Sequence, residues 1–266
     1  MGYRIALYSL VPVRTEAREG AEQSTQMLFG ELCEIIESQE PRAKSRWYRV
    51  RLESDGQEGW VDAKMVTPMT EQEYSTYKSA YENAATVAFP MTFAVSENNG
   101  QTIPLTAGTQ LTNYNEGRFE VLGVGFRIDP NMIITQPIEM NEQNLLQTVR
   151  FFLNVPYLWG GKNAMGMDCS GFTQVIMSLF GKHLLRNASE QATQGSPVSE
   201  LKIAKAGDLV FFDHEDGKIS HVGIAIDPER VIHCSGRVKV EKLDETGIFN
   251  TEQNNYTHHL VAIKRL

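Results

Sequence analysis

A glycine-rich segment that runs directly into a cysteine constrains the fold of this 266-residue chain more than any other feature. The segment, residues 159–167, favours loop geometry because glycine reaches backbone angles that are closed to other residues. Beyond it, apolar residues recur at i, i+3, i+4 and i+7 and predict one buried helix face: Phe172, Val175, Ile176 and Leu179. Gly181 is a natural end for this helix. The sequence therefore predicts a helix that begins at Cys169.

A thiol in the first turn of a helix lies at the positive end of the helix dipole, which favours the thiolate. This position predicts that Cys169 is a nucleophile, whereas the commoner role of a free cysteine is that of a small buried apolar residue. Asp168 is a candidate helix cap, and its carboxylate would raise the pKa of the thiol if no cation balanced it.

Two histidines downstream support the prediction that Cys169 is a nucleophile. His221 opens the strand-like run 221–226, His233 lies within the run 231–235, and the turn-forming residues 227–230 between them predict a hairpin. One imidazole would take the thiol proton and the second would orient the first. A regular four-residue loop would place the two side chains on opposite faces, so we predict a one-residue offset such as a β-bulge.

Five separated motifs now carry a resemblance to a known family: PYLWGG at 156–161, DCSGF at 168–172, RNASEQ at 186–191, GDLVFF at 207–212 and HVGI at 221–224. Together they resemble the NlpC family of papain-like cysteine peptidases, which cut bacterial cell-wall peptides. The resemblance implies an α+β catalytic domain over residues 139–266, with a helix packed on an antiparallel sheet. It also implies that Cys169 is the nucleophile, His221 the general base and His233 the third, orienting residue.

The chain before this domain predicts mainly short strands. Residues 1–67 alternate in hydropathy between glycine turns, and the segments PVR at 12–14, LFGE at 28–31, WYRV at 47–50 and GWV at 59–61 resemble a bacterial SH3-like domain. Residues 68–85 predict a linking helix opened by a capping box of Thr70 with Glu73, and its tyrosines share a face: Tyr74, Tyr77 and Tyr81.

Residues 86–138 return to short strands, with turns at 98–100 and 115–117, and we read them as a second, more divergent SH3-like domain. Asn141 is then expected to cap a further helix whose buried face is Leu145, Val149, Phe152 and Leu153. The predicted architecture is thus two small SH3-like barrels followed by a papain-like catalytic domain.

This arrangement resembles enzymes that cleave γ-D-glutamyl bonds in murein peptides. In that group the first barrel closes one end of the cleft, so that only a free N-terminal L-alanyl-γ-D-glutamyl segment fits. The substrate contacts implied by the resemblance are Glu22, Gln57, Tyr157, Trp159, Asp168, Ser170, Arg186, Asn187 and Ser189. Tyr157 and the backbone amides of Asp168 and Cys169 are candidate donors to the oxyanion.

Two of these positions depart from the pattern of the group. Gln57 stands where those enzymes usually present a tyrosine, and Asn187 stands where an aspartate helps to bind the substrate ammonium. Either the amine is held differently or the substrate differs in its first residue. Asn187 can also cap a helix together with Glu190, and the two roles are compatible.

Charge, hydropathy and cysteine spacing limit the partners and cofactors that the chain is expected to bind. A formal charge of −8 without a basic stripe argues against nucleic acid as a partner, and no apolar run approaches the length of a membrane span. Three cysteines make no disulfide framework. Cys234 beside His233 raises the possibility of a metal site with Cys169 and His221, but the spacing matches no zinc pattern, so we expect neither a metal nor a cofactor.

The first residues lack the features of a signal peptide, which favours a cytoplasmic monomer, or an exported protein if a leader precedes this sequence. Our reading is a cysteine endopeptidase that hydrolyses the γ-D-glutamyl–diamino acid bond of murein peptides. The alternatives are an amidase or acyltransferase on the same scaffold and a murein-binding protein without activity. The pair His258-His259 carries no functional signal in the sequence.

Overall fold

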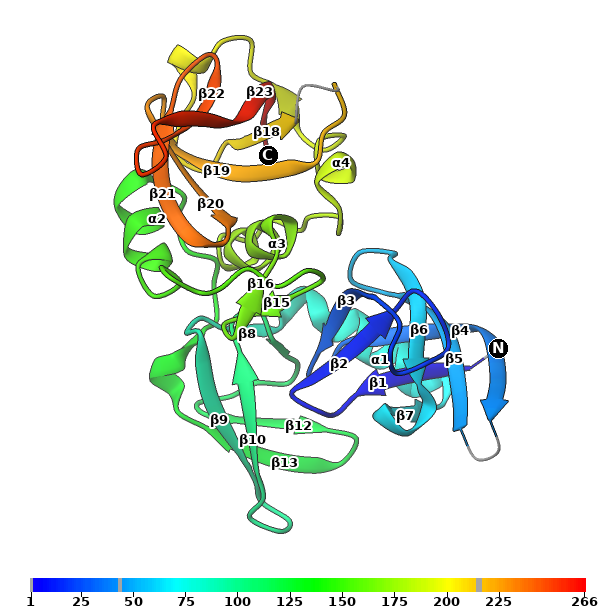
Figure 1. The fold of residues 1–266 in the computed structure, drawn as a ribbon. Coiled ribbons are helices and arrows are strands. Elements are labelled where there is room, and N and C mark those ends of the chain that lie inside the picture. The colour runs from blue at the N-terminus through cyan, green and yellow to red at the C-terminus, as the bar shows by residue number, and fades with distance from the viewer. Residues whose placement is uncertain (1, 43–44, 214–216) are drawn as a thin grey trace. The chain divides into compact units, whose positions relative to one another are not determined.

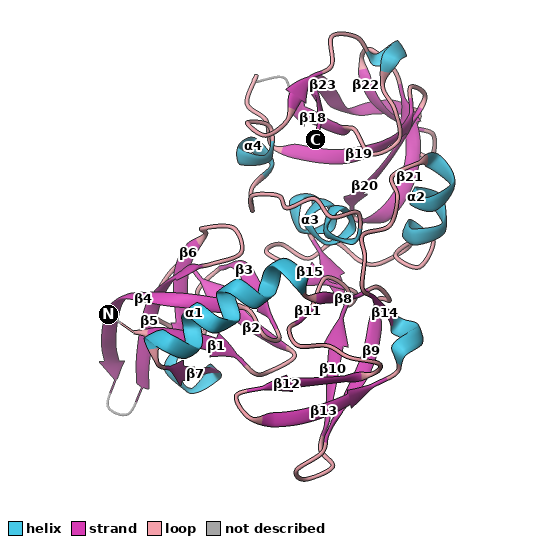
Figure 2. Ribbon diagram, turned by 180° about the vertical axis from the view of Figure 1, so that it is seen from behind, coloured by secondary structure: helices cyan, strands magenta, loops and turns pink. Residues whose placement is uncertain are grey.

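The computed structural model describes residues 2–42, 45–213 and 217–266, which form two compact units, Met1–Gln136 and Pro137–Leu266 (Figures 1 and 2). The border between the units lies two residues before the start of the catalytic domain expected from the sequence. Each unit has buried apolar clusters of its own.

The first part of unit 1 is a seven-stranded antiparallel sheet in the order β3-β2-β6-β5-β4-β1-β7. Its strands are β1 (Tyr3–Ala6), β2 (Leu10–Arg14), β3 (Gln23–Leu28), β4 (Leu32–Arg42), β5 (Ser45–Leu52), β6 (Glu58–Asp62) and β7 (Val66–Met69). The strands expected over residues 1–67 are confirmed. Alternate residues of β2 and β6 are buried, so one side of this sheet covers an aliphatic core.

Helix α1 (Glu71–Ala80) follows and confirms the predicted capping box. Thr70 accepts a hydrogen bond from the backbone N–H of Glu73 at 3.2 Å, and the Glu73 carboxylate accepts one from the backbone N–H of Thr70 at 2.7 Å. Tyr74, Tyr77 and Tyr81 all pack on the same apolar cluster, as their spacing predicts, although Tyr81 lies in the short 3-10 helix that follows α1.

The rest of unit 1 consists of two smaller sheets, ordered β10-β9-β13-β12 and β11-β8-β14. The strands are β8 (Ala85–Val87), β9 (Met91–Ser96), β10 (Thr102–Thr106), β11 (Gln110–Leu111), β12 (Arg118–Val121), β13 (Val124–Ile128) and β14 (Ile133–Ile134). Phe29 contacts Phe119 and Phe126 edge-on, with ring centroids 6.2 and 5.8 Å apart. The two parts of unit 1 therefore share one apolar core.

Unit 2 is built on an antiparallel sheet in the order β17-β23-β18-β19-β20-β21-β22, and β22 also pairs with β23, so that β18 to β23 form a closed ring. The strands are β15 (Lys162–Asn163), β16 (Gly166–Met167), β17 (Ser196–Pro197), β18 (Leu209–Asp213), β19 (His221–Asp227), β20 (Arg230–Ser235), β21 (Arg237–Leu243), β22 (Gly247–Asn250) and β23 (Asn255–Arg265). The helices are α2 (Glu142–Val149), α3 (Cys169–Leu179) and α4 (Ala188–Gln191). Helix α3 contacts β19 and β20, which lie beside it in Figure 1.

Helix α3 begins at Cys169 as predicted, but it is more deeply buried than the predicted single face. Every residue of the helix except Ser178 is buried. Gly171 permits this close packing, because a Cβ atom at that position would lie 2.1 Å from the carbonyl oxygen of Gly161. Gly181, with φ of 72°, ends the helix as expected.

Helix α2 confirms Asn141 as its cap, since the side chain accepts a hydrogen bond from the backbone N–H of Asn144 at 2.9 Å. Leu145, Val149 and Phe152 are buried. The prediction for Leu153 is wrong: the helix ends at Val149, and the turn that follows exposes the Leu153 side chain.

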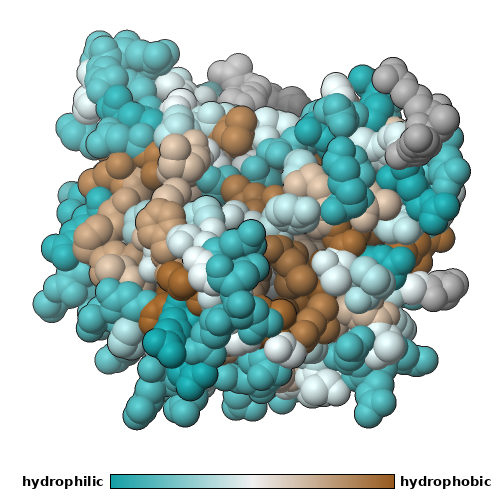
Figure 3. All heavy atoms as spheres, turned by 90° about the horizontal axis from the view of Figure 1, so that it is seen from below, coloured by the Kyte–Doolittle hydropathy of each residue, from teal (hydrophilic) through white to brown (hydrophobic). Residues whose placement is uncertain are grey.

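Apolar side chains also reach the surface. On the face drawn in Figure 3, apolar atoms lie in separate patches bordered by hydrophilic ones. Strand β9, for example, exposes Met91, Phe93 and Val95 along one side. No helix within the described residues is long and apolar enough to cross a membrane.

Candidate active site

The segment that leads into α3 is fixed by its own backbone. The N–H of Leu158 donates to the carbonyl of Met167 at 3.0 Å, and the N–H of Met167 donates to the carbonyl of Pro156 at 3.1 Å. The N–H of Tyr157 donates to Gly236 at 2.9 Å, which ties the segment to the turn between β20 and β21. These bonds set the position of Cys169 at the first residue of α3.

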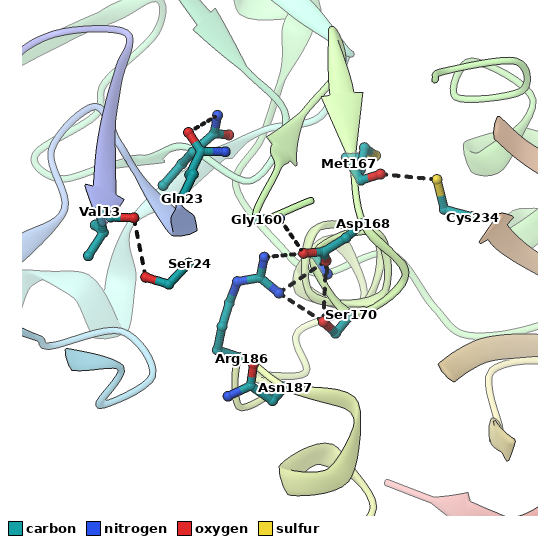
Figure 4. Close-up of polar contacts among 12 residues, drawn as sticks. Val13, Gln23, Ser24, Gly160, Met167, Asp168, Ser170, Arg186, Asn187 and Cys234 are labelled. Carbon is teal, nitrogen blue, oxygen red and sulfur yellow. Dashed lines mark hydrogen bonds and ion pairs between the residues drawn. The ribbon is translucent and has the colours of Figure 1, made fainter. Parts of the chain in front are cut away.

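Asp168 caps α3, as expected, and also forms a buried ion pair (Figure 4). Its Oδ1 accepts hydrogen bonds from the N–H of Gly171 at 2.7 Å and from Ser170 Oγ at 3.2 Å, and its Oδ2 accepts one from the N–H of Gly160 at 2.9 Å. Arg186 reaches both oxygens, with Nη1–Oδ1 at 3.0 Å and Nη2–Oδ2 at 2.5 Å. We call Asp168, Ser170 and Arg186 the Asp168–Arg186 cluster.

The structure thus brings three of the expected substrate contacts together and bonds them to one another. Arg186 also donates to Ser170 Oγ at 2.8 Å. These bonds hold the start of α3 to the loop that precedes α4, and a contact of these side chains with substrate stays a prediction.

Three further residues that were expected to contact substrate are exposed: Asn187, Ser189 and Trp159. Asn187 is the N-cap residue of α4 and forms a capping box with Glu190, so the capping role is confirmed. The Glu190 carboxylate accepts hydrogen bonds from the Asn187 backbone N–H at 3.1 Å and from its Nδ2 at 2.9 Å. Ser189 is exposed on α4. Trp159 is 60% exposed in the loop before Cys169, and its contact with substrate stays a prediction.

Glu22 and Gln57 belong to unit 1. Glu22 is exposed in the loop between β2 and β3, where the sequence places it. Gln57 precedes β6, and its backbone N–H donates to Asp55 Oδ1 at 3.1 Å. Their contact with substrate stays a prediction.

The Cys169 thiol is buried, with 7% of the residue exposed. Burial and, after it, the negative charge of Asp168 raise the pKa of the thiol to about 11, although the N–H groups of Val222 and Ser170 and the charge of Arg186 lower it in part. The prediction that the helix dipole favours a resting thiolate is therefore wrong, because removal from water outweighs it. The bond from Val222 also shows that the thiol lies against the first residues of β19.

The two histidines meet as the sequence predicts. In the β19–β20 hairpin Gly223 pairs with His233, and the register shifts between Ala225 and Asp227. This bulge confirms the predicted offset and puts His221 and His233 on the same face. Nε2 of His221 lies 2.8 Å from Nδ1 of His233, and both rings are buried.

Sequence reasoning missed two residues that extend this arrangement. Glu241 on β21 bonds to the far side of His233, with Oε2 2.8 Å from Nε2. His258 on β23 lies over His221, with ring centroids 4.2 Å apart and planes at 30°. Neither residue belongs to a motif singled out in the sequence: Glu241 comes from β21, which pairs with β20, and His258 comes from β23, which pairs with β18 beside β19. We call His221, His233 and Glu241 the histidine row.

One expected oxyanion donor is excluded. The backbone N–H of Asp168 already donates to the carbonyl of Gly161 at 3.2 Å. The N–H of Cys169 and the Tyr157 hydroxyl stay as predicted donors. Burial and then the charges of Cys169 and Asp168 raise the pKa of Tyr157, so its phenol keeps its proton and is able to donate it in a hydrogen bond.

The structure gives Cys234 a structural setting. Its thiol donates to the carbonyl of Met167 at 3.1 Å, and burial raises its pKa to about 12 (Figure 4). Across residues 2–42, 45–213 and 217–266, no group of three or more His, Cys, Asp or Glu side chains is arranged to hold a metal ion.

A thiol at the start of a helix, packed against an antiparallel sheet that presents two bonded imidazoles, has the parts of an activated cysteine nucleophile: an attacking atom, a proton acceptor and an orienting group. This fold and site define the class of papain-like cysteine peptidases.

Comparison with known proteins gives the family. Residues 154–261 match the NlpC/P60 family, and residues 13–65 match the bacterial dipeptidyl-peptidase SH3 domain. The chain is 30% identical over 255 residues to the gamma-D-glutamyl-L-lysine dipeptidyl-peptidase of Bacillus subtilis, covering 91% of this chain and 80% of that protein. The chain belongs to the NlpC/P60 family and is a cysteine peptidase.

Further relatives agree with this assignment. A Bacillus cereus protein of the same name is 38% identical over 92 residues, which cover 34% of this chain and 27% of that protein. The crystal structure of a Bacillus cereus NlpC/P60 family protein has a TM-score of 0.79 at 20% identity, covering 99% of both chains. An NlpC/P60 endopeptidase from Photobacterium damselae has a TM-score of 0.71 at 15% identity, covering 98% of this chain and 72% of that one. These two structures share the fold.

Proposed function

We propose that this peptidase hydrolyses the bond between γ-D-glutamate and the diamino acid of murein peptides, with Cys169 as nucleophile, His221 as general base and His233 as orienting residue. The observation that carries the proposal is the 2.8 Å bond between the imidazoles of β19 and β20, together with the contact of Val222 on β19 with the Cys169 thiol. The similarity over 91% of the chain to a gamma-D-glutamyl-L-lysine dipeptidyl-peptidase supports the choice of bond.

The chemistry follows from the raised pKa of the thiol. Because Cys169 keeps its proton at rest, attack requires transfer of that proton to His221 as the sulfur bonds to the γ-carbonyl carbon of D-glutamate. The tetrahedral oxyanion takes hydrogen bonds from the N–H of Cys169 and from Tyr157. His221 then returns the proton to the leaving amine of the diamino acid, and the C–N bond breaks.

Water completes the cycle. It attacks the thioester carbon while His221 accepts one of its protons, and the collapse of the second tetrahedral intermediate expels the sulfur, which regains the proton from His221. The products are a dipeptide with a free γ-carboxyl group and an intact Cys169 thiol. The imidazole takes up a proton and returns it twice in this cycle, which makes its orientation by His233 important.

Two further proposals concern the N-terminal residue of the substrate and the fold of residues 86–138 in unit 1. We propose a free N-terminal L-Ala on the substrate, which the resemblance to enzymes of this kind supports. Residues 86–138 are proposed as a second, divergent SH3-like domain, supported by their short antiparallel strands and by the match of residues 13–65 to a bacterial SH3 domain.

The test uses L-Ala-γ-D-Glu linked to L-Lys or to diaminopimelate, with products identified by mass spectrometry. The wild-type protein should release L-Ala-γ-D-Glu, and Cys169→Ala should lower the rate by about 10³-fold or more, because the nucleophile is lost. N-acetylation of the L-Ala should slow cleavage. Cys33→Ala, which removes a buried thiol of unit 1, is the matched control and should keep the activity.

Each alternative gives a different product. Release of ammonia or transfer of the acyl group to an added amine would point to an amidase or acyltransferase, and binding of sacculi without thiol-dependent hydrolysis would point to a binding protein. Hydrolysis that survives Cys169→Ala would refute the mechanism.

A further inference from the structure

We propose that Glu241 is a positioning residue that fixes which nitrogen of each imidazole carries the proton, so that His221 presents a lone pair on Nδ1 to the nucleophile. This inference rests on the proposed roles of Cys169 and His221. It adds a carboxylate to the three residues that the family resemblance implied from the sequence, Cys169, His221 and His233.

The sheet places Glu241 within reach of His233. In the β20–β21 pair, His233 lies opposite Lys239 and Val231 lies opposite Glu241. Because alternate residues of a strand share a face, Lys239 and Glu241 both lie on the side of His233. The Glu241 side chain is only 9% exposed, and its Oε2 accepts from His233 Nε2 at 2.8 Å and from Lys239 Nζ at 3.0 Å.

These contacts determine the charges of Glu241 and His233. Burial alone would raise the pKa of Glu241, but the hydrogen bonds and charges of His233 and Lys239 outweigh it and lower that pKa. Burial lowers the pKa of His233, whose side chain is fully covered. At neutral pH the pair is therefore a carboxylate and a neutral imidazole with a single proton.

A carboxylate is a hydrogen-bond acceptor, so the single proton of His233 must lie on Nε2. Its Nδ1 then carries a lone pair and must accept the hydrogen bond across the 2.8 Å contact with His221. That contact requires the proton of His221 to lie on Nε2. The lone pair of His221 is thus confined to Nδ1, the nitrogen that remains to take a proton from Cys169.

Removal of the Glu241 carboxylate removes the acceptor that keeps the His233 proton on Nε2. His233 can then carry its proton on Nδ1, where it would face the Nε2 proton of His221 unless His221 also changes tautomer. A His221 ring with its proton on Nδ1 donates to the thiol and cannot act as its base. The carboxylate also stabilises the positive charge that His221 gains during the reaction, and Lys239 offsets part of that effect.

The test compares Glu241→Ala with Glu241→Gln. The Gln carbonyl oxygen can replace Oε2 and accept from both His233 and Lys239, so Gln keeps the tautomers without the charge. Glu241→Ala should lower kcat by about 10- to 100-fold, as is typical for partners that orient a functional imidazole, with KM changed by less than about twofold. Glu241→Gln should recover most of kcat.

Nitrogen-15 NMR of histidine-labelled protein reads the tautomers directly. Wild type and Glu241→Gln should show both rings protonated on Nε2, and Glu241→Ala should show mixed tautomers for His233 and His221. The matched control is Glu252→Gln, a carboxylate of the same unit that is 75% exposed and paired with Arg237; it should change neither readout.

Two results would overturn the proposal: wild-type kcat in Glu241→Ala, or a loss of kcat with both rings still protonated on Nε2. Failure of the proposed substrate is distinguishable from both. The rate at which iodoacetamide alkylates Cys169 needs no peptide, so if the murein peptide is not cleaved, the alkylation rate and the NMR spectrum of each variant still decide the role of Glu241.

Discussion

Two buried polar groups flank the Cys169 thiol, and they are built from opposite chemistry. The Asp168–Arg186 cluster joins a carboxylate and a guanidinium whose side chains are 8% and 2% exposed, with both carboxylate oxygens bonded to the cation. The histidine row joins two imidazoles to a carboxylate through single hydrogen bonds. The first arrangement is an ion pair with several hydrogen bonds, whereas the second contains imidazoles, which can accept and return a proton.

The two groups therefore have different roles in the site: the Asp168–Arg186 cluster supports its structure, and the histidine row transfers protons. The cluster bonds the loop at Gly160, the first turn of α3 and the segment before α4. The histidine row is a line of single side-chain hydrogen bonds that ends at Glu241, which also bonds to Lys239. We therefore expect damage to the cluster to appear mainly as lost stability, and damage to the row mainly as lost turnover.

The largest effect should come from breaking the cluster. Arg186→Met leaves the Asp168 carboxylate buried without its cation, which should lower the free energy of unfolding by about 3–5 kcal/mol. Chemical denaturation monitored by circular dichroism measures this change.

The control for this variant is Arg230→Met. Arg230 forms ion pairs with Glu142 and Asp227 in the same unit, but it is 42% exposed, so its removal should cost about 1 kcal/mol or less. Equal losses in the two variants would contradict the distinction between the cluster and an ordinary surface pair.

A smaller effect is expected from the ring that covers the histidine row. His258→Ala removes the side chain stacked on His221, an interaction of the kind worth about 0.5–1.5 kcal/mol, so kcat should fall by up to about tenfold. His258→Phe restores an aromatic face and should keep most of the turnover. The measurement is kcat for both variants at neutral pH. If Phe is as damaging as Ala, the polar atoms of His258 and not its packing support the row.

The sequence predicted the parts of the site that depend on local rules. The caps at Asp168, Asn141 and Thr70 follow from spacing along one helix end, and the bulge that aligns His221 with His233 follows from counting residues between two strands. Each of these features is decided by a few consecutive residues.

Features that depend on distant packing could not be predicted in this way. His258 reaches His221 through the pairing of β23 with β18, two strands far apart in the sequence, and Glu241 reaches His233 through the β20–β21 register, which no motif specifies. The pKa of Cys169 was predicted in the wrong direction because the helix dipole is readable from the sequence, whereas the burial of nearly all of α3 is not.

The central claim is that His221 removes the proton from a thiol that would otherwise stay protonated. The most direct measurement is the rate of Cys169 alkylation by iodoacetamide as a function of pH, in wild type and in His221→Gln. We expect a reactive thiol near neutral pH in the wild-type protein. In His221→Gln, the rate at pH 7 should fall by about 100-fold or more and recover only as the pH approaches the thiol pKa of about 11. Equal reactivity of the two proteins at pH 7 would contradict the account.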